Sequence, residues 1–226
     1  MKSIITSFFV ASASVATLPA AITITVANNV PNGTVSGGSG TGAGSISTSS
    51  GTMSSNLGLP VTTYTVSGVN LTSEGGTASE SFTFTISYTA TTNGVTAGTP
   101  VFSSFGNVGV GTGGIVSGAE TLTATISLTS TSFAGLSLTG FTKARAGGFT
   151  SGETGTFTWQ SGGTDTVEFG STISNVSGNS VTLTAIGAST LNFEGFEAQF
   201  SAVPEPAATT LLGMGTLALL RRRRTA

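Results

Sequence analysis

Hydrophobic and polar residues alternate with a period of two along most of the chain. Residues 82–88 read FTFTISY and residues 122–128 read LTATISL, so every second position is apolar and the intervening positions are Thr or Ser. This alternation is typical of β-strands that bury one face, and the branched Cβ of threonine favours strands. No ten-residue window of the body carries a helical stripe. The pattern therefore predicts an all-β body.

Strands are expected wherever this alternation runs between Gly-rich turns such as 74–76, 161–163 and 177–179. The expected strand ranges are 22–27, 61–71, 80–91, 100–105, 119–130, 135–141, 154–160, 164–169, 180–186 and 189–201. Many short strands joined by turns predict an antiparallel β-sandwich with a jelly-roll-like arrangement. A stacked β-solenoid is the alternative, but the sequence has no fixed repeat to support it.

The last expected strand changes its phase part-way along. Its apolar positions are odd-numbered as far as Phe193 and even-numbered from Phe196 onward. A β-bulge lets two residues of one strand face one residue of its neighbour, so one extra residue restores the alternation. We therefore expect a bulge at Glu194-Gly195, with both phenylalanines buried.

Residues 32–58 consist mostly of Gly, Ser and Thr and contain few bulky side chains. Such a stretch buries too little apolar surface to offset the entropy lost on ordering it. We expect a loop or linker there, in which Ile46 and Met53 could still attach to a sheet.

Residues 1–20 have the layout of a secretory signal peptide. Lys2 precedes an apolar run from Ile4 to Ala16, and small residues follow. A cut after Ala16 or near Ala20 fits the small-residue rule. An ordinary first strand or helix is the alternative, although the polar alternation begins only after the candidate cut. The β-sandwich body is therefore expected to span residues 21–202.

An uncharged, mostly apolar run covers residues 207–220 and is followed by Arg221, Arg222, Arg223 and Arg224. As a helix this run would extend roughly 21 Å, which is short against a hydrocarbon core of about 30 Å. The arginines would hold the tail on the cytoplasmic side. We expect a short transmembrane helix that stops transfer, with an interfacial helix as the alternative.

Val203, Pro204, Glu205 and Pro206, placed ahead of this apolar run and its arginines, resemble the PEP-CTERM sorting signal of exported bacterial proteins. The resemblance covers residues 203–226, and the signal peptide agrees with it. It implies recognition by exosortase, a membrane-embedded peptidase-like enzyme that would process the tail. The body would then pass from a transient membrane anchor to the cell surface or the extracellular space. The resemblance also implies an association with biofilm and makes exopolysaccharide a candidate partner.

Composition removes several classes of chemistry. The chain has no Cys and no His, and 7% of its residues are charged, against roughly 25% in an average soluble domain. Disulfides, the usual zinc sites and Ser-His-Asp or Cys-His nucleophiles therefore cannot form. The body holds two basic and eight acidic residues, so it would repel nucleic acid. We expect no cofactor and no nucleic-acid partner.

Acidic residues and a glycine motif offer candidates for chemistry. Asp165 and Glu168 could contribute to a calcium site, although calcium requires more oxygen ligands than two side chains supply. Glu194 and Glu197 could form the carboxylate pair of a glycosidase, but residues three apart in a regular strand face opposite sides. Residues 109–114 spell G-x-G-x-x-G without the following helix that a dinucleotide site needs. We interpret the four acids as surface residues and expect no metal site.

Lys143 and Arg145 are the only basic residues of the body and share one face at a strand end. They could bind a carboxylate or an acidic sugar, but we favour a salt bridge to Glu153 or another acid. Trp159 could stack on a sugar, but its phase in the strand indicates the core.

These observations favour a structural protein of the cell surface or matrix rather than an enzyme. Few charges guard the expected sheet edges, and charged edges usually keep β-proteins from pairing with one another. A carbohydrate-binding module is the first alternative, and it requires an exposed ring at Trp159, Tyr64 or Tyr88. A polysaccharide hydrolase or lyase is the second alternative, and it requires two carboxylates in a cleft.

Overall fold

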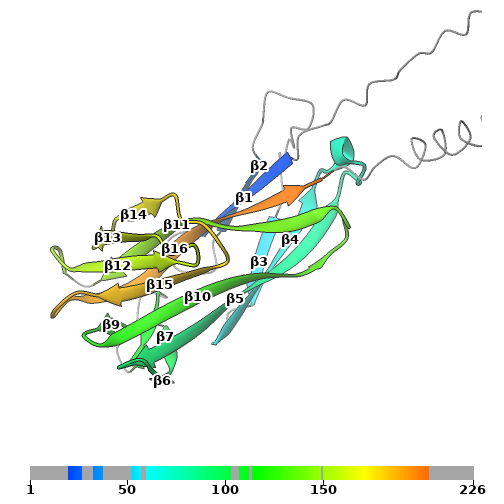
Figure 1. The fold of residues 1–226 in the computed structure, drawn as a ribbon. Helices are drawn as coiled ribbons and strands as arrows, with labels where there is room; N and C mark the ends of the chain where they lie inside the picture. The colour runs from blue at the N-terminus through cyan, green and yellow to red at the C-terminus, as the bar shows by residue number, and fades with distance from the viewer. Residues whose placement is uncertain are drawn as a thin grey trace, which may run out of the picture.

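The protein is built from two facing antiparallel β-sheets (Figure 1). The computed structural model describes residues 20–26, 33–37, 52–56, 60–102, 107–111, 114–148 and 150–203. Apolar side chains from the inner faces of both sheets form one core. The expectation of an all-β sandwich is confirmed. The segments expected as a signal peptide (1–20) and as a sorting signal with its membrane helix (203–226) lie outside the described residues, apart from Ala20 and Val203.

Within the described residues, each sheet has eight strands. Sheet A contains β1 (Ala20–Val26), β2 (Gly33–Gly37), β7 (Pro100–Phe102), β8 (Val108–Val110), β9 (Val116–Ser117), β11 (Leu136–Gly148), β14 (Thr172–Ser174) and β16 (Thr190–Ala202). Sheet B contains β3 (Thr52–Asn56), β4 (Val61–Val69), β5 (Glu80–Thr92), β6 (Val95–Gly98), β10 (Glu120–Thr131), β12 (Thr154–Trp159), β13 (Thr164–Glu168) and β15 (Ser180–Ala185). A 3-10 turn, η1 (Thr72–Glu74), joins β4 to β5.

The chain crosses between the two sheets at both sides of the sandwich. Sheet A runs β14-β11-β16-β1-β2, and β8 and β9 also pair with β16. Sheet B runs β13-β12-β15-β10-β5-β4-β3. The edge strands β13 and β14 are consecutive along the chain, and so are the edge strands β2 and β3. The chain therefore passes from one sheet to the other at each side.

The strand ranges expected from the sequence match β1, β4, β5, β10, β12, β13, β15 and β16 to within two residues at each end. The range 135–141 was too short, because β11 continues to Gly148. Its pairing with β16 shifts register between Leu138 and Gly140 and again between Phe141 and Lys143. These two bulges interrupt the period of two that defines a strand in the sequence. The range 100–105 begins with β7, and residues 103–106 are not described.

The segment 32–58 was expected to be a loop or linker, and the structure places two strands in it. β2 pairs with β1 and β3 pairs with β4, where Met53 lies opposite Val66. Both are edge strands, and each is ordered by ladder hydrogen bonds to a single neighbour. The attachment of Met53 to a sheet agrees with the sequence analysis, but the composition gave no sign of two paired strands.

The bulge expected in the last strand is confirmed. Arg145 of β11 lies opposite Gly195, and the next residue, Ala146, lies opposite Phe193. Glu194 is therefore the extra residue of β16. Phe193 and Phe196 are both buried on either side of it.

Aromatic rings connect the two sheets through the core. Phe82 of sheet B lies 4.8 Å from Phe200 of sheet A, measured between ring centroids. Phe157 of sheet B meets Phe193 of sheet A at 6.1 Å with nearly perpendicular planes. Offset and edge-to-face pairs of this kind add to the stability gained by burying the rings.

Candidate functional site

The bulge at Glu194 brings the only basic residues of the body together with two acids on the outer face of sheet A. Lys143 and Arg145 lie two residues apart on β11, so their side chains project from the same face. Lys143 Nζ lies 2.8 Å from Glu197 Oε2, and Arg145 Nε lies 2.9 Å from Glu194 Oε2. In a regular strand Glu194 and Glu197 would face opposite sides, and the extra residue places both on this face.

The two ion pairs are reinforced by neighbouring polar groups. The Thr142 hydroxyl donates a hydrogen bond of 2.8 Å to Glu197 Oε1. The expected salt bridges are therefore confirmed, with Glu194 and Glu197 as partners. Glu153, which the sequence offered as a partner, accepts hydrogen bonds from the backbone N–H groups of Thr150 and Thr190.

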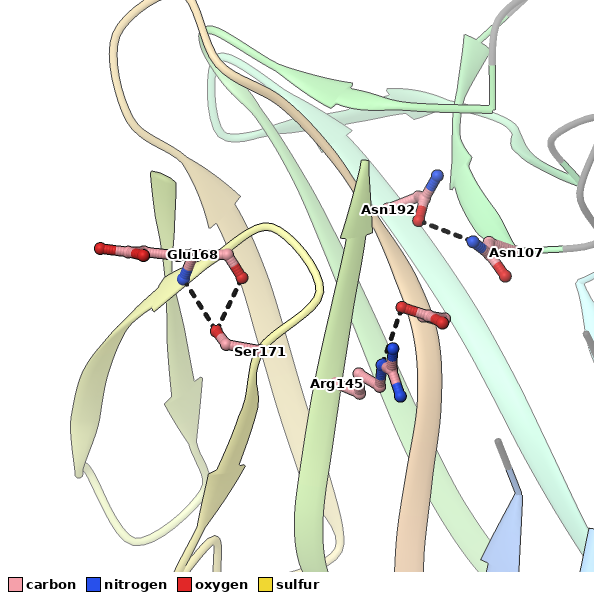
Figure 2. Close-up of polar contacts among 6 residues, drawn as sticks. Asn107, Arg145, Glu168, Ser171 and Asn192 are labelled. Carbon is pink, nitrogen blue, oxygen red and sulfur yellow. Dashed lines mark hydrogen bonds and ion pairs between the residues drawn. The ribbon is translucent and has the colours of Figure 1, made fainter. Parts of the chain in front are cut away.

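Two buried asparagines lie beside the Arg145–Glu194 pair (Figure 2). Asn107 Nδ2 donates to Asn192 Oδ1 at 3.1 Å. Among the described residues, Asn107 Oδ1 and Asn192 Nδ2 have no hydrogen-bond partner. Gly147 lies directly beneath, since a Cβ there would stand 2.4 Å from Asn192 Oδ1 and 3.2 Å from Glu194 Oε2. The glycine therefore makes room for this polar cluster.

The charges on the outer face of sheet A compensate one another in the two ion pairs. Each carboxylate of Glu194 and Glu197 faces a cation, so neither is placed as a free general acid or nucleophile of the kind that glycosidases use. Within the described parts of the chain, no three His, Cys, Asp or Glu residues stand close enough together to hold a metal ion. The arrangement fixes the packing of β11 on β16 and offers little acid–base chemistry.

Asp165 and Glu168, the candidates for calcium, lie on the edge strand β13 and are exposed. They are three residues apart in a regular strand and so face opposite sides of the sheet. The backbone of Glu168 is tied to Ser171, whose hydroxyl donates to the Glu168 carbonyl oxygen at 2.7 Å (Figure 2). These acids put charge on an exposed sheet edge, which disfavours pairing with another chain.

The aromatic candidates for sugar stacking lie in or against the core. Tyr64 and Tyr88 are buried. Trp159 is half-buried, packs against the core and is covered by its own turn, because a Cβ on Gly163 would come within 2.3 Å of the indole ring. Trp159 thus packs against the margin of the core, on the side that its phase in the strand predicts. None of these three rings offers the open face that a carbohydrate-binding module needs.

Gly109 and Gly114 of the G-x-G-x-x-G segment lie in two antiparallel backbone stretches. Val110 and Ile115 form an antiparallel bridge, and no helix follows, since β9 begins at Val116. A Cβ on Gly109 would lie 2.0 Å from the carbonyl oxygen of Gly114. Gly109 therefore allows two backbone segments to touch, and a strand follows the motif, as the sequence predicted.

The two ends of the described body lie side by side at one pole of the sandwich. Ala20 at the start of β1 is the register partner of Ala202 at the end of β16. Ala202 is also opposite Leu136, and the Val203 N–H donates to the Gly135 carbonyl oxygen at 3.0 Å. Val203, the first residue of the VPEP motif, is thus attached to the body, whereas Pro204, Glu205, Pro206 and the four arginines lie outside the described residues.

Two buried carboxylates near this pole gave no signal in the sequence. Phe82, close to the start of β5, contacts Phe200 near the end of β16, so the loop that precedes β5 lies at the same pole. Glu74 in η1 is fully buried, and neither of its oxygens has a hydrogen-bond partner among the described residues. Glu80 accepts bonds from the Ser132 hydroxyl and the Thr77 N–H, and the Ser132 bond is the main cause that lowers its pKa.

Comparison with protein-family models, curated proteins and solved structures finds no match for this chain. Within the described residues, no helix combines the length and apolar character needed to cross a membrane.

Proposed function

We propose that this chain is an exported structural protein of the cell surface or the extracellular matrix, sorted and processed by exosortase. Its parts are an N-terminal signal peptide, a jelly-roll-like β-sandwich body and a short C-terminal membrane helix stopped by arginines. The function is non-enzymatic. The layout of the two terminal segments and the resemblance of residues 203–226 to the PEP-CTERM signal are the grounds in the sequence.

The observation that carries the proposal is the pairing of Ala20 with Ala202. Because these residues are neighbours, the segments before β1 and after β16 start from the same pole. A body anchored by its tail would therefore be attached to the membrane at one pole. Both outer sheet faces and the opposite pole would then stay accessible. This geometry suits a domain that is anchored first and released later.

The position of the sorting motif agrees with processing outside the fold. The ladder of β16 ends at Ala202, and Val203 makes one backbone bond to Gly135. Two prolines in the next three residues cannot continue a ladder. A peptidase acting at or after the motif would therefore cut outside the last strand and release an intact sandwich.

Fractionation of the native host tests the proposal. Cells carrying the wild-type protein, the Glu205→Ala variant and the matched control Glu168→Ala are separated into cytosol, membrane and medium, and the mass of the protein is measured in each. We expect a shortened body at the cell surface or in the medium for wild type and control, and retention of the tailed form in the membrane for Glu205→Ala. An intact polypeptide in the cytosol, with both termini uncut, would contradict export and processing together.

A further inference from the structure

The outer face of sheet B carries threonines in straight rows across five neighbouring strands. One row contains Thr164, Thr158, Thr182, Thr123 and Thr89, contributed in order by β13, β12, β15, β10 and β5. The row beside it contains Thr166, Thr156, Thr184, Thr121 and Thr91 on the same strands. All ten side chains are exposed or half-buried. Figure 1 shows these five strands side by side.

Hydrogen bonds between hydroxyls hold parts of these rows in fixed orientation. Thr123 and Thr182 join at 2.8 Å, Thr158 and Thr164 at 3.0 Å, and Thr91 and Thr121 at 2.7 Å. A hydroxyl has one donor and two acceptor sites, so each bonded pair keeps free sites for a further partner. The rows therefore present pre-arranged hydroxyl groups with a methyl group beside each one.

The spacing of the rows is regular in both directions. Neighbouring strands stand about 4.7–4.9 Å apart, so one row extends roughly 19 Å, and the two rows are about 7 Å from each other along the strands. One step along a row is close to the length of one sugar unit in an extended β-linked glycan. A chain lying along a row would therefore place one sugar at each strand.

The outer face of sheet B differs in charge from the outer face of sheet A. Both basic residues of the body belong to β11 in sheet A, where they pair with acids. The two threonine rows contain no charged residue, and the acids of β13, Asp165 and Glu168, stand at its edge. An uncharged hydroxyl face has no attraction for an acidic polymer and costs no desolvation of charge when a neutral one binds. The electrostatics therefore fit a neutral partner.

We propose that the threonine rows of sheet B are a docking surface for a neutral, extended polysaccharide chain that lies across the strands. Hydroxyl groups of successive sugars exchange hydrogen bonds with the threonine hydroxyls, and the threonine methyls contact the C–H faces of the rings. Each contact is weak, and affinity comes from several strands acting together on one chain. This proposal rests on the proposed function, because it names the polymer that an exported body would hold.

Sheet twist favours a single polymer chain over a crystalline surface. Neighbouring strands rotate by about 20–25° relative to one another, so five strands cannot match a flat lattice in two dimensions. A single row can still follow a line, and a flexible chain can follow that line. A crystal face such as ice would need both rows to be coplanar with it.

The test compares hydroxyl removal within one row with two matched controls. The row variant is Thr158→Val, Thr182→Val and Thr123→Val, which removes three hydroxyls and keeps a branched Cβ that favours the strand. The first control places Ser at the same three positions and so keeps the hydroxyls. The second control makes Thr23→Val and Thr139→Val on the outer face of sheet A.

Full-length protein in mild detergent is run by affinity electrophoresis through gels that contain hydroxyethyl cellulose, mixed-linkage β-glucan or acidic alginate. We expect wild type and both controls to be retarded by the neutral glucans at any salt concentration, and the row variant to bind at least about tenfold more weakly, as the loss of three hydrogen bonds implies. Circular dichroism checks that each variant is folded.

Four outcomes would overturn this assignment. The first two are that no neutral glucan retards the wild type, or that the row variant binds as tightly as the wild type. The other two are that only alginate retards the protein, in a salt-sensitive way, or that the protein inhibits ice growth without binding glucan. Any of them leaves the host fractionation result unaffected. Conversely, if the protein binds glucan but is never exported, the proposed function is contradicted and the docking surface on sheet B is still supported.

Discussion

Glu194 Oε2 accepts a hydrogen bond from Arg145 Nε at 2.9 Å because Glu194 is the extra residue of the β16 bulge. Its side chain is 12% exposed and that of Arg145 is 35% exposed. The second pair on the same face, Lys143 and Glu197, is 43% and 19% exposed. The first pair is therefore the more shielded from water, and the two pairs should differ in their contribution to stability.

Removing Arg145 should destabilise the fold more than removing Lys143. The Arg145→Met variant leaves a nearly buried carboxylate without its donor, at a cost of about 1–3 kcal/mol. Lys143→Met breaks a solvent-exposed pair, at a cost below about 1 kcal/mol. The double variant Arg145→Met, Glu194→Gln should recover part of the loss, because no unpaired charge remains. Urea unfolding measures all three, and equal losses for the two single variants would contradict the difference in burial.

Glu74 should be destabilising in its present place. A fully buried carboxylate without a hydrogen-bond partner among the described residues is costly, so Glu74→Met should raise the free energy of unfolding by roughly 1–3 kcal/mol. The matched control Glu168→Met, on an exposed edge, should change stability by less than about 0.5 kcal/mol. A Glu74→Met variant less stable than wild type would contradict this prediction.

Glu80 should make the fold sensitive to acid. Its folded pKa is lowered, chiefly by the hydrogen bond from Ser132 and then by the one from the Thr77 N–H. A lowered carboxyl pKa contributes stability above the unfolded value of roughly 4.3, and this contribution is lost as the pH falls through the folded pKa. Ser132→Ala should therefore be less stable than wild type at neutral pH.

The free energy of unfolding of Ser132→Ala and wild type, measured from neutral pH downward, should converge as Glu80 becomes protonated. Ser127→Ala, at an exposed serine of β10, is the matched control and should follow wild type at every pH. A gap between Ser132→Ala and wild type that stays constant with pH would exclude the carboxylate as the cause.

The two tyrosines should ionise only when the protein unfolds. The chain contains two tyrosines, and burial raises the pKa of both Tyr64 and Tyr88. A raised tyrosine pKa stabilises the fold fully below the ordinary value of about 10, and this stabilisation is lost as the pH rises above it. Tyrosinate absorbance and loss of circular dichroism should therefore appear together in one step.

The urea-unfolded protein serves as the control for this titration, since its tyrosines should titrate near the ordinary pKa. Tyrosinate absorbance that grows while the native circular dichroism persists would show that a ring reaches solvent in the folded state.

The candidate site was partly predictable from the sequence. The phase change between Phe193 and Phe196 predicted the bulge because apolar residues must stay on the core side of a strand. The spacing of Lys143 and Arg145 predicted that they share a face. Their partners could not be predicted, because the register of β11 on β16 depends on three bulges that only the paired strands reveal.

Edge strands and buried acids were harder to predict. β2 and β3 lie in a Gly, Ser and Thr segment and owe their order to backbone bonds with β1 and β4. Glu74 reads as a turn residue beside two glycines, and its burial results from the packing of η1 at the pole. Neither feature has a local pattern, because each depends on a neighbour distant in sequence.

The sequence by itself determined that the body is a β-sandwich, since alternation of apolar and hydroxyl side chains fixes which face of each strand is buried. The proposal of export also rests on the sequence alone, since signal peptides and sorting motifs are linear segments. Only the tertiary structure decided that Ala20 and Ala202 meet at one pole and that ten threonines align in two rows. Strand order and register depend on pairing between segments that are distant in sequence. The alternation within one strand is compatible with many different orders and registers.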